Sequence, residues 1–245
     1  MISCFRNTIV LFLCCLVLGC AIETDPKQVV LQSLEAHGGL EAWENAEEIR
    51  YSKRTITYDS LGAVKSDVVQ EHINRFQPAF YAEMSTSPTD SIIQGVFLEN
   101  DEVHVVTSGN QQLDDAVFEK FRKDMMGAHY VLWQPYKLLE PDAHLSYKGT
   151  KTMDNGKIAD VVQVNYYNED GSEGNTWWYY FDMETHKLLG NMVYHHPTYA
   201  LIENLAYETK TGLSLNAERK SYRTDSLGNK KYLIAHYYYE ILSFK

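Results

Sequence analysis

The stretch that decides the fold class is residues 177–189, which read Trp-Trp-Tyr-Tyr-Phe-Asp-Met-Glu-Thr-His-Lys-Leu-Leu. Its aromatic run predicts a strand over 175–182, because aromatic side chains fit the pleated, half-buried surface of a sheet. A short polar segment follows, and the return of apolar residues predicts a second strand over 187–195. Strand, short turn and strand is therefore the local pattern at the centre of this chain.

The same pattern extends outward from this stretch, from Ile49 to the C-terminus. Segments of about ten residues alternate with turn signals, among them Asp59-Ser60-Leu61-Gly62 and Asp154-Asn155-Gly156. The other predicted strands are 47–58, 65–76, 79–86, 91–99, 102–107, 144–153, 157–168, 199–208, 213–224 and 230–244. This spacing is typical of an antiparallel sandwich or barrel, and no linker rich in Pro, Gly or Ser divides it. We therefore expect one mainly β domain over residues 27–245.

A helical segment precedes the first strand. Asp25 is a favourable N-cap and Pro26 fits the first turn, so a helix is predicted to begin there. It is predicted to end at His37, because Gly38-Gly39 can take the positive φ of a helix stop. His37 then lies where a cation interacts well with the carbonyl end of the helix. A second short helix is expected to bury Trp43.

An insertion over about 110–141 interrupts the β pattern a second time. Residues 114–126 predict a helix with one apolar face, formed by Val117, Phe118, Phe121 and Met125. The continuation from Tyr130 to Leu139, which includes Trp133, is too apolar for an exposed loop. We expect this insertion to cover the opening of a barrel and to help enclose a cavity.

The first 26 residues predict export and tethering. One basic residue, Arg6, precedes an apolar run from Ile9 to Leu18, and the run ends in Leu16-Val17-Leu18-Gly19-Cys20. Ten apolar residues are too few for a membrane span. This segment resembles the lipobox of bacterial lipoproteins, which implies cleavage of residues 1–19, acylation of Cys20 and a lipidated tether over 20–26. The alternative is an ordinary signal peptide, or a membrane anchor, with a chance cysteine.

Composition narrows the classes of partner. The formal net charge is −11, so the chain is a poor electrostatic match for nucleic acid. All four cysteines lie in the first 20 residues, which leaves no cysteine in the body for a disulfide or a metal site. We expect no cofactor, and attachment to a membrane only through the acylated N-terminus.

Two stretches carry a family resemblance. Residues 36–43, which read Ala-His-Gly-Gly-Leu-Glu-Ala-Trp, resemble the start of a family of uncharacterised Gram-negative lipoproteins. Residues 179–189 resemble the central hairpin of that family and hairpins of the LolA/LolB lipoprotein-carrier superfamily. The resemblance implies an antiparallel half-open barrel wrapped around helices, with an apolar cavity. Because Ala21 rather than Asp follows Cys20, it also implies the outer membrane, on either the periplasmic face or the cell surface.

Aromatic residues are the main candidates for a binding site, since the chain has 18 Tyr and 4 Trp. Alternation along a strand places Trp177, Tyr179 and Phe181 on one face, and Trp178 and Tyr180 on the other. Such residues pack sheets or line a cavity for a small molecule, and both interpretations remain open here. The candidate ligand-binding residues are Phe121, Trp133, Trp177, Tyr179, Tyr237 and Tyr239.

Motifs for catalysis and metal binding are absent from the sequence. His195-His196 are adjacent, so in a regular strand they point to opposite faces and do not share a metal. There is no phosphate-binding loop, no nucleophile elbow and no H-x-x-x-H helix. The apolar cavity that the family resemblance implies favours binding of a hydrophobic or amphiphilic, lipid-like ligand. The alternatives are an envelope scaffold that binds a protein partner and a hydrolase with its site at the cavity mouth.

Overall fold

The computed structural model describes residues 24–87, 93–100, 102–107, 113–167 and 170–245. Three α-helices and one short 3-10 helix are found in these residues: α1 (Pro26–Ala36), α2 (Leu40–Glu44), α3 (Asp115–Leu132) and η1 (Tyr136–Leu139). The strands are β1 (Glu48–Tyr58), β2 (Val64–Arg75), β3 (Tyr81–Ser87), β4 (Ile93–Glu99), β5 (Glu102–Thr107), β6 (His144–Thr152), β7 (Ile158–Tyr167), β8 (Glu173–Asp182), β9 (Leu188–His195), β10 (Thr198–Glu208), β11 (Leu215–Thr224) and β12 (Lys230–Phe244). Each predicted strand is confirmed to within a few residues.

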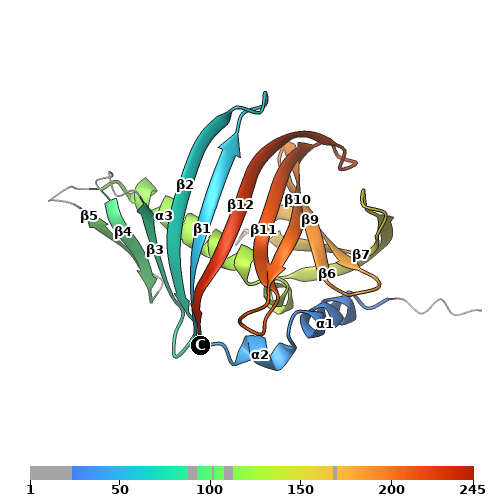
Figure 1. The fold of residues 1–245 in the computed structure, drawn as a ribbon, viewed down its shortest axis with the longest axis horizontal. Coiled ribbons are helices and arrows are strands. Elements are labelled where there is room, and N and C mark those ends of the chain that lie inside the picture. Colours follow the sequence, from blue (N-terminus) through green and yellow to red (C-terminus); the bar gives the residue numbers. More distant parts are fainter. Residues whose placement is uncertain (1–23, 88–92, 101, 108–112, 168–169) are drawn as a thin grey trace, which may run out of the picture.

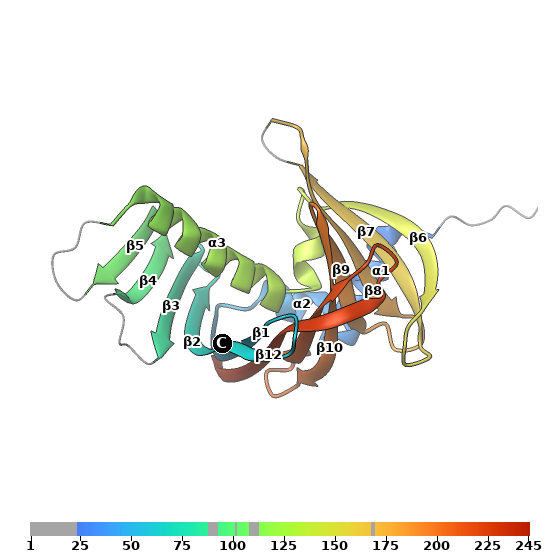
Figure 2. The ribbon, with the colours of Figure 1, turned by 90° about the horizontal axis from the view of Figure 1, so that it is seen from above.

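The strands form one antiparallel sheet of 12 strands in the order β5-β4-β3-β2-β1-β12-β11-β10-β9-β8-β7-β6. Strands that are consecutive in the chain pair with each other except β5 and β6, and β1 also pairs with β12. The one break in this cycle lies between β5 and β6, which are the two edges of the sheet. Strong curvature turns the sheet into an open half-barrel, as Figures 1 and 2 show.

The segment with α3 and η1 joins the two edge strands. Figure 2 shows α3 running across β5, β4 and β3 on the inner face of the sheet, and the structure records contacts with all three strands. Asp114 caps the helix by accepting a hydrogen bond of 3.3 Å from the Ala116 N–H. The helix continues beyond the predicted end at Met126, as far as Leu132. It does so because its buried stripe also continues, through Ala128 and His129 to Leu132.

The N-terminal helices form where they were predicted. The Asp25 carboxylate caps α1 by accepting from the Lys27 N–H at 2.9 Å, and the helix ends at His37. Gly38 has a φ of +116°, and a Cβ added there would lie 2.5 Å from the carbonyl oxygen of Gly212. Glycine is therefore required at this position on two counts. Together α1 and α2 close the lower end of the half-barrel in Figure 1.

Three apolar clusters stabilise the fold. The largest lies on the inner face, where α1, α2 and η1 pack against the strands, and it includes Trp43, Trp133 and Tyr179. The second lies between α3 and β3–β5. The third lies on the outer face and includes Tyr180, with Trp178 packed against it. The predicted division of the aromatic residues of β8 between two faces is thus confirmed.

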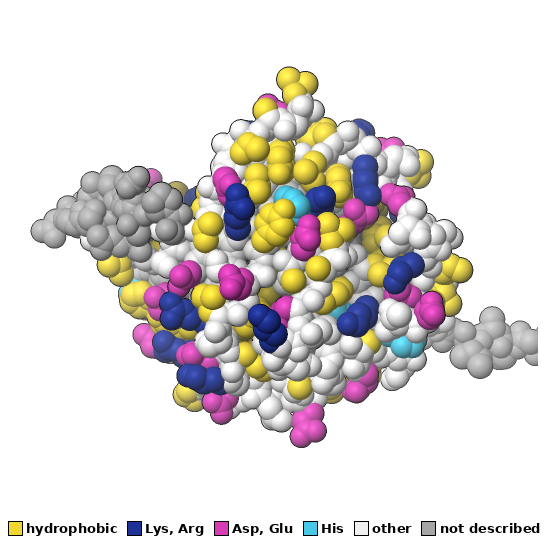
Figure 3. Space-filling view, in the orientation of Figure 1, with side chains coloured by type: hydrophobic (Ala, Val, Ile, Leu, Met, Phe, Trp, Pro, Cys, Tyr) yellow, Lys and Arg dark blue, Asp and Glu magenta, His cyan; other side chains and the backbone are white. Residues whose placement is uncertain are grey.

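The outer face of the sheet carries mixed charges. Figure 3 looks onto the face opposite α3 and shows basic and acidic side chains interspersed with apolar ones. Three cross-strand ion pairs join the described strands β1 and β2: Arg50 with Glu71 at 2.7 Å, Arg54 with Asp67 at 2.5 Å and Arg75 with Glu48 at 3.1 Å. Such exposed pairs each contribute little stability. None of the helices in the described part of the chain has the length and hydrophobicity that a membrane span needs.

Candidate functional site

A cavity of about 480 Å³ opens on the inner face of the half-barrel. Strands β1 and β8–β12 form its wall, and Val131 from the last turn of α3 closes one side. Apolar and aromatic side chains make up most of the lining: Val131, Trp177, Val193, Ala200, Ile202, Ile234, Tyr237 and Tyr239. A mostly apolar lining with a few polar groups is typical of small-molecule sites, and this volume lies in the usual range for them.

Strand register explains why these side chains meet. Trp177 is opposite Val193, Val193 is opposite Ala200, and Ala200 is opposite Arg223. Residues opposite each other in a sheet point to the same face, so the four form one row across β8–β11. Arg219 lies deeper on β11, nearer to α1, and is opposite Tyr237 of β12.

The polar part of the lining is basic. Lys53, Arg219 and Arg223 contribute to it, and none of the fourteen lining residues is Asp or Glu. Arg219 is only 3% exposed and donates to two amide oxygens, from Nε to Asn204 at 2.9 Å and from Nη2 to Asn191 at 3.2 Å. The cavity therefore combines apolar walls with positive charge, in a protein whose net charge is −11.

A second cavity, of about 710 Å³, lies beyond Trp177, which lines both cavities. Its wall differs in charge, because it contains Glu140 and Asp142 together with tyrosines and His196. The two cavities thus differ in charge and share the Trp177 side chain in their walls.

The six predicted ligand-binding residues fall into two groups. Trp177, Tyr237 and Tyr239 line the basic cavity. Trp133 is 3% exposed and packs in the main core, where its ring lies 4.3 Å from that of Phe76. Phe121 packs against the cluster between α3 and β3–β5. These positions make Trp133 and Phe121 part of the helix packing in the structure.

Tyr179, the sixth residue, lies in a hydrogen-bond network whose members Tyr130 and Tyr166 line the second cavity. Its hydroxyl is 2.6 Å from the Tyr130 hydroxyl and accepts from Gln134 at 2.9 Å. Tyr130 also contacts the hydroxyl of Tyr166 at 2.8 Å. Burial raises the pKa of Tyr179 and of Tyr130 well above that of free tyrosine, so both are neutral. This network joins α3 to β7 and β8.

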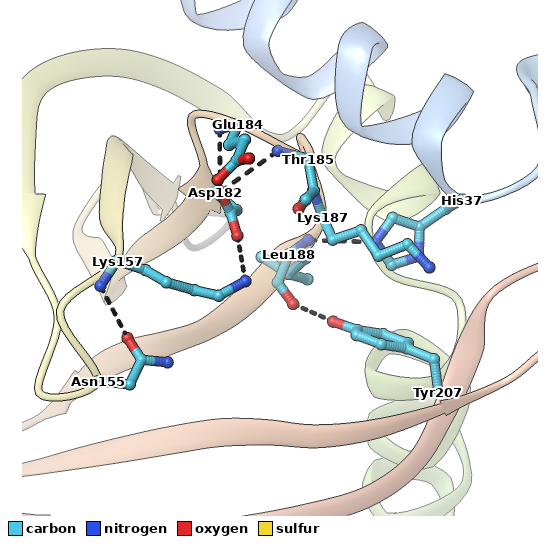
Figure 4. Close-up of polar contacts among 9 residues, drawn as sticks. All are labelled: His37, Asn155, Lys157, Asp182, Glu184, Thr185, Lys187, Leu188 and Tyr207. Carbon is cyan, nitrogen blue, oxygen red and sulfur yellow. Dashed lines mark hydrogen bonds and ion pairs between the residues drawn. The ribbon is translucent and has the colours of Figure 1, made fainter.

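His37 has a different role from the one predicted. Its side chain is fully buried, and burial lowers its pKa to about 4, so the ring is neutral and the expected cation at the helix end is absent. Nδ1 donates to the Ser214 carbonyl at 2.7 Å, and Nε2 accepts from the Leu188 N–H at 3.1 Å. Figure 4 shows the ring beside Leu188, whose carbonyl accepts from the Tyr207 hydroxyl. His37 thus fastens α1 to β9 and β11.

The turn between β8 and β9 is held by Asp182. One carboxylate oxygen accepts from the backbone N–H groups of Glu184 and Thr185, and the other pairs with Lys157 (Figure 4). Burial raises the pKa of Asp182, but these bonds outweigh that effect and the pKa is lowered to about 2. The carboxylate is therefore a structural group of the turn.

The adjacent histidines lie at the end of β9. His195 Nδ1 is 2.7 Å from Asn175 Oδ1, and His196 Nδ1 is 2.8 Å from the Tyr194 hydroxyl. Burial and the charge of Arg223 lower the pKa of His195. In the described ranges, no three His, Cys, Asp or Glu side chains are arranged to hold a metal ion. Cys20, the predicted lipidation site, lies outside the described residues.

Sequence reasoning did not single out Lys53, Arg219 and Arg223. Alternation within the predicted strand 213–224 does place Arg219 and Arg223 on one face. That pattern was the available signal, but it leaves open which face is concave.

Comparison with models of protein families identifies the family of this chain. A family model matches residues 6–211, which is more than half of its 245 residues. The chain belongs to DUF6503, a family of unknown function. Among curated proteins, no sequence matches this DUF6503 protein.

Solved structures show the same fold. A LolA-superfamily protein from Nitrosomonas europaea is similar with a TM-score of 0.55 at 8% identity, over 91% of this chain and 93% of that chain. A DUF1329 family protein from Desulfovibrio piger gives 0.50 at 9% identity, over 89% and 92%. An outer membrane lipoprotein-sorting protein domain from Vibrio parahaemolyticus gives 0.50 at 7%, over 89% and 90%. The LolA-like half-barrel predicted for this DUF6503 protein is therefore confirmed.

Proposed function

We propose that this protein binds a hydrophobic or amphiphilic, lipid-like ligand in the basic cavity, the 480 Å³ space lined by Trp177, Tyr237 and Tyr239. The observation that carries the proposal is the apolar wall of this cavity, which is open on the inner face of the sheet. Burying an alkyl chain there removes apolar surface from water on both sides, which is the main favourable term in such binding.

The proposal includes a place in the cell. The N-terminal pattern supports acylation at Cys20 and attachment to the outer membrane through the acyl chains. Several acyl chains give durable anchoring, whereas one chain gives marginal binding. The similarity to an outer membrane lipoprotein-sorting protein domain is consistent with an envelope role. The tether over 20–26 then holds the half-barrel close to a source of lipid.

A scaffold role is the second candidate, and one observation favours it. Strands β5 and β6 are the edges of the sheet, and within the described residues each has a side without a neighbouring strand. An edge strand can pair with an extended segment of another protein. A scaffold of this kind does not require the cavity.

A matched pair of variants separates the two functions. An anthroyloxy-labelled stearic acid methyl ester is titrated into the full chain in a fixed concentration of nonionic detergent. Trp177→Ala removes an indole from the cavity wall, whereas Trp178→Ala removes one from the outer face of the same strand. We expect saturable binding to wild type, and affinity about tenfold weaker in Trp177→Ala, since a lost ring contact costs roughly 1.5 kcal/mol.

Trp178→Ala controls for general destabilisation and is expected to bind like wild type. Absence of saturable binding to the folded wild-type chain, together with no lipid in solvent extracts of the purified protein, would exclude the cavity function. That result leaves the scaffold role as the explanation of the fold.

A further inference from the structure

The charge of the cavity points to the class of ligand, and we infer that it is an amphiphile with an anionic headgroup. The headgroup, a carboxylate or a phosphate, binds between Lys53 and Arg219, and its hydrocarbon chain lies along the apolar side chains that lead from Ile202 to Trp177. This inference rests on the proposed function and adds the chemistry of the headgroup to it.

Arg219 is the first observation. A guanidinium is always charged, and a buried charge is costly unless it is paired. Arg219 is 3% exposed, yet in the described part of the chain it forms no ion pair, and its only hydrogen bonds go to the neutral amides of Asn204 and Asn191. These two bonds use Nε and Nη2, so the N–H groups of Nη1 have no acceptor among the described residues. The amides therefore fix the orientation of the guanidinium and leave its charge uncompensated.

Lys53 is the second observation. On the inner face of β1, it is opposite Tyr239, and its ammonium lies 5.6 Å from the centre of the Tyr237 ring. Arg219 is opposite Tyr237 from the other side, on β11. The two cations therefore flank one aromatic ring of the cavity wall. Among the described residues, Lys53 has no carboxylate within ion-pair distance either.

The contrast with other basic residues makes this arrangement specific. On the outer face of the neighbouring positions, Arg50 and Arg54 each pair with a carboxylate across β1 and β2. Arg223, the third cation of the cavity, lies about 13 Å farther along β11 and, among the described residues, donates only to the backbone carbonyl of Tyr199, at 3.5 Å. Arg50 and Arg54 are thus paired with acids on the outer face, whereas Lys53, Arg219 and Arg223 have no acid partner in the described part of the chain. An anion bound there replaces the missing carboxylates, and Arg is well suited to hold carboxylate or phosphate through two hydrogen bonds.

The apolar part of the cavity wall, from Ile202 near Arg219 to Trp177, supplies the place for the hydrocarbon tail. Ile202, Ala200 and Val193 follow one another along this wall, and Trp177 ends it. A ligand with a carboxylate or phosphate at Arg219 and an alkyl chain along these residues pairs with the cations and also covers the apolar wall. A neutral lipid covers the apolar wall but leaves the cations unpaired.

The test compares two probes that differ only in charge. Anthroyloxy-labelled stearate and its methyl ester are titrated into the full chain in the same detergent, so that partition into micelles is common to all proteins. We expect wild type to bind the carboxylate about tenfold more tightly than the ester, which is the usual value of a hydrogen bond to a charged group. Equal affinity for both probes overturns the headgroup inference and leaves the proposed function intact. Binding of neither probe overturns the proposed function itself.

Single substitutions test whether Arg219 and Lys53 are the cations that bind the headgroup. Arg219→Met and Lys53→Met are expected to abolish the preference for the carboxylate, with the affinity for the ester unchanged within about twofold. Lys220→Met is the matched control, because it removes one cation from the next position of β11, outside the lining. If Arg219→Met fails to fold, the half-buried Lys53 still provides the test. A preference that persists in both variants contradicts the placement. Competition by laurate and by dodecyl phosphate, each against the stearate probe, then distinguishes a carboxylate from a phosphate headgroup.

Discussion

The backbone N–H of Leu188 donates a hydrogen bond of 3.1 Å to Nε2 of His37, which lies 151 residues earlier in the chain. This bond joins the two stretches that carried the family resemblance, residues 36–43 and 179–189. The two stretches that resemble the family are therefore in direct contact in the folded protein. The His-Gly-Gly sequence fastens the first helix to the central hairpin, and no catalytic function is needed to explain it.

The first prediction concerns pH. Burial lowers the pKa of His37 from 6.5 to about 4, and the pKa values of buried His72 and His129 are lowered to about 3. In the unfolded chain these rings take up protons below pH 6.5, whereas in the folded chain they do not. Stability is therefore fully present above pH 6.5 and is lost as the pH falls toward 4, with a slope of up to about 1.4 kcal/mol per pH unit for each ring.

Urea denaturation between pH 7 and pH 4.5 checks this dependence. His37→Gln is expected to unfold more easily at pH 7. Because the variant has one ring fewer that takes up a proton on unfolding, the slope of its unfolding free energy against pH is expected to be smaller by up to about 1.4 kcal/mol per pH unit. His104→Gln, which changes an exposed ring, serves as the control. A slope in His37→Gln equal to that of wild type would show that His37 is not held neutral.

The second prediction concerns Gly38. A methyl group there meets the Gly212 carbonyl oxygen at 2.5 Å in a backbone with a φ of +116°. Gly38→Ala is expected to lower the free energy of unfolding by about 3 kcal/mol or more. Gly62→Ala isolates the effect of conformation, because Gly62 has a φ of +89° and nothing lies within 4 Å of an added Cβ. Its expected cost is about 1–2 kcal/mol. Equal denaturation midpoints for the two variants would contradict the steric argument.

The third prediction distinguishes a core from a movable lid in the α3–η1 segment. Trp133 stacks on Phe76 and lies edge-on to Trp43 at 4.9 Å. Trp133→Ala is expected to cost about 3–5 kcal/mol of stability, as for other large core truncations. Ligand affinity of the folded protein is expected to stay unchanged, because the ring is absent from the cavity lining. A small stability cost combined with a large loss of affinity would instead identify a lid. Phe121→Ala extends the same test to the other end of α3.

The fourth prediction concerns the anchor. Cys20→Ala is expected to abolish acylation and retention in the membrane, since Cys20 closes the apolar export segment. Metabolic labelling with an alkyne fatty acid, followed by membrane fractionation, measures both. Label that remains on the variant would rule out Cys20 as the acylated residue.

The fifth prediction concerns cross-links in the body. No cysteine follows Cys20, and the histidine spacings are poor for a structural metal site. The Tm is therefore expected to be the same with and without a reductant or a chelator. A large fall of the Tm in the chelator would show that a metal ion contributes to the fold.

The sequence alone determined the elements whose causes are local. Turn residues and an alternation of period two located the strands, and the same alternation separated Trp177 from Trp178. Asp25 and Gly38-Gly39 located both ends of the first helix, because capping depends on a few adjacent residues. The end of α3 was placed too early, at Met126, because its last turns are stabilised by contacts with other parts of the chain rather than by local signals.

Only the tertiary structure decided how distant residues combine. His37 is neutral because the folded chain buries it, which lowers its pKa, whereas its position at a helix end had indicated a cation. Alternation placed Arg219 and Arg223 on one face of their strand, but the curvature of the whole sheet makes that face concave. A local pattern repeats every two residues, whereas curvature and burial arise from all twelve strands together. For this reason the basic cavity is a property of the folded half-barrel and of no single segment.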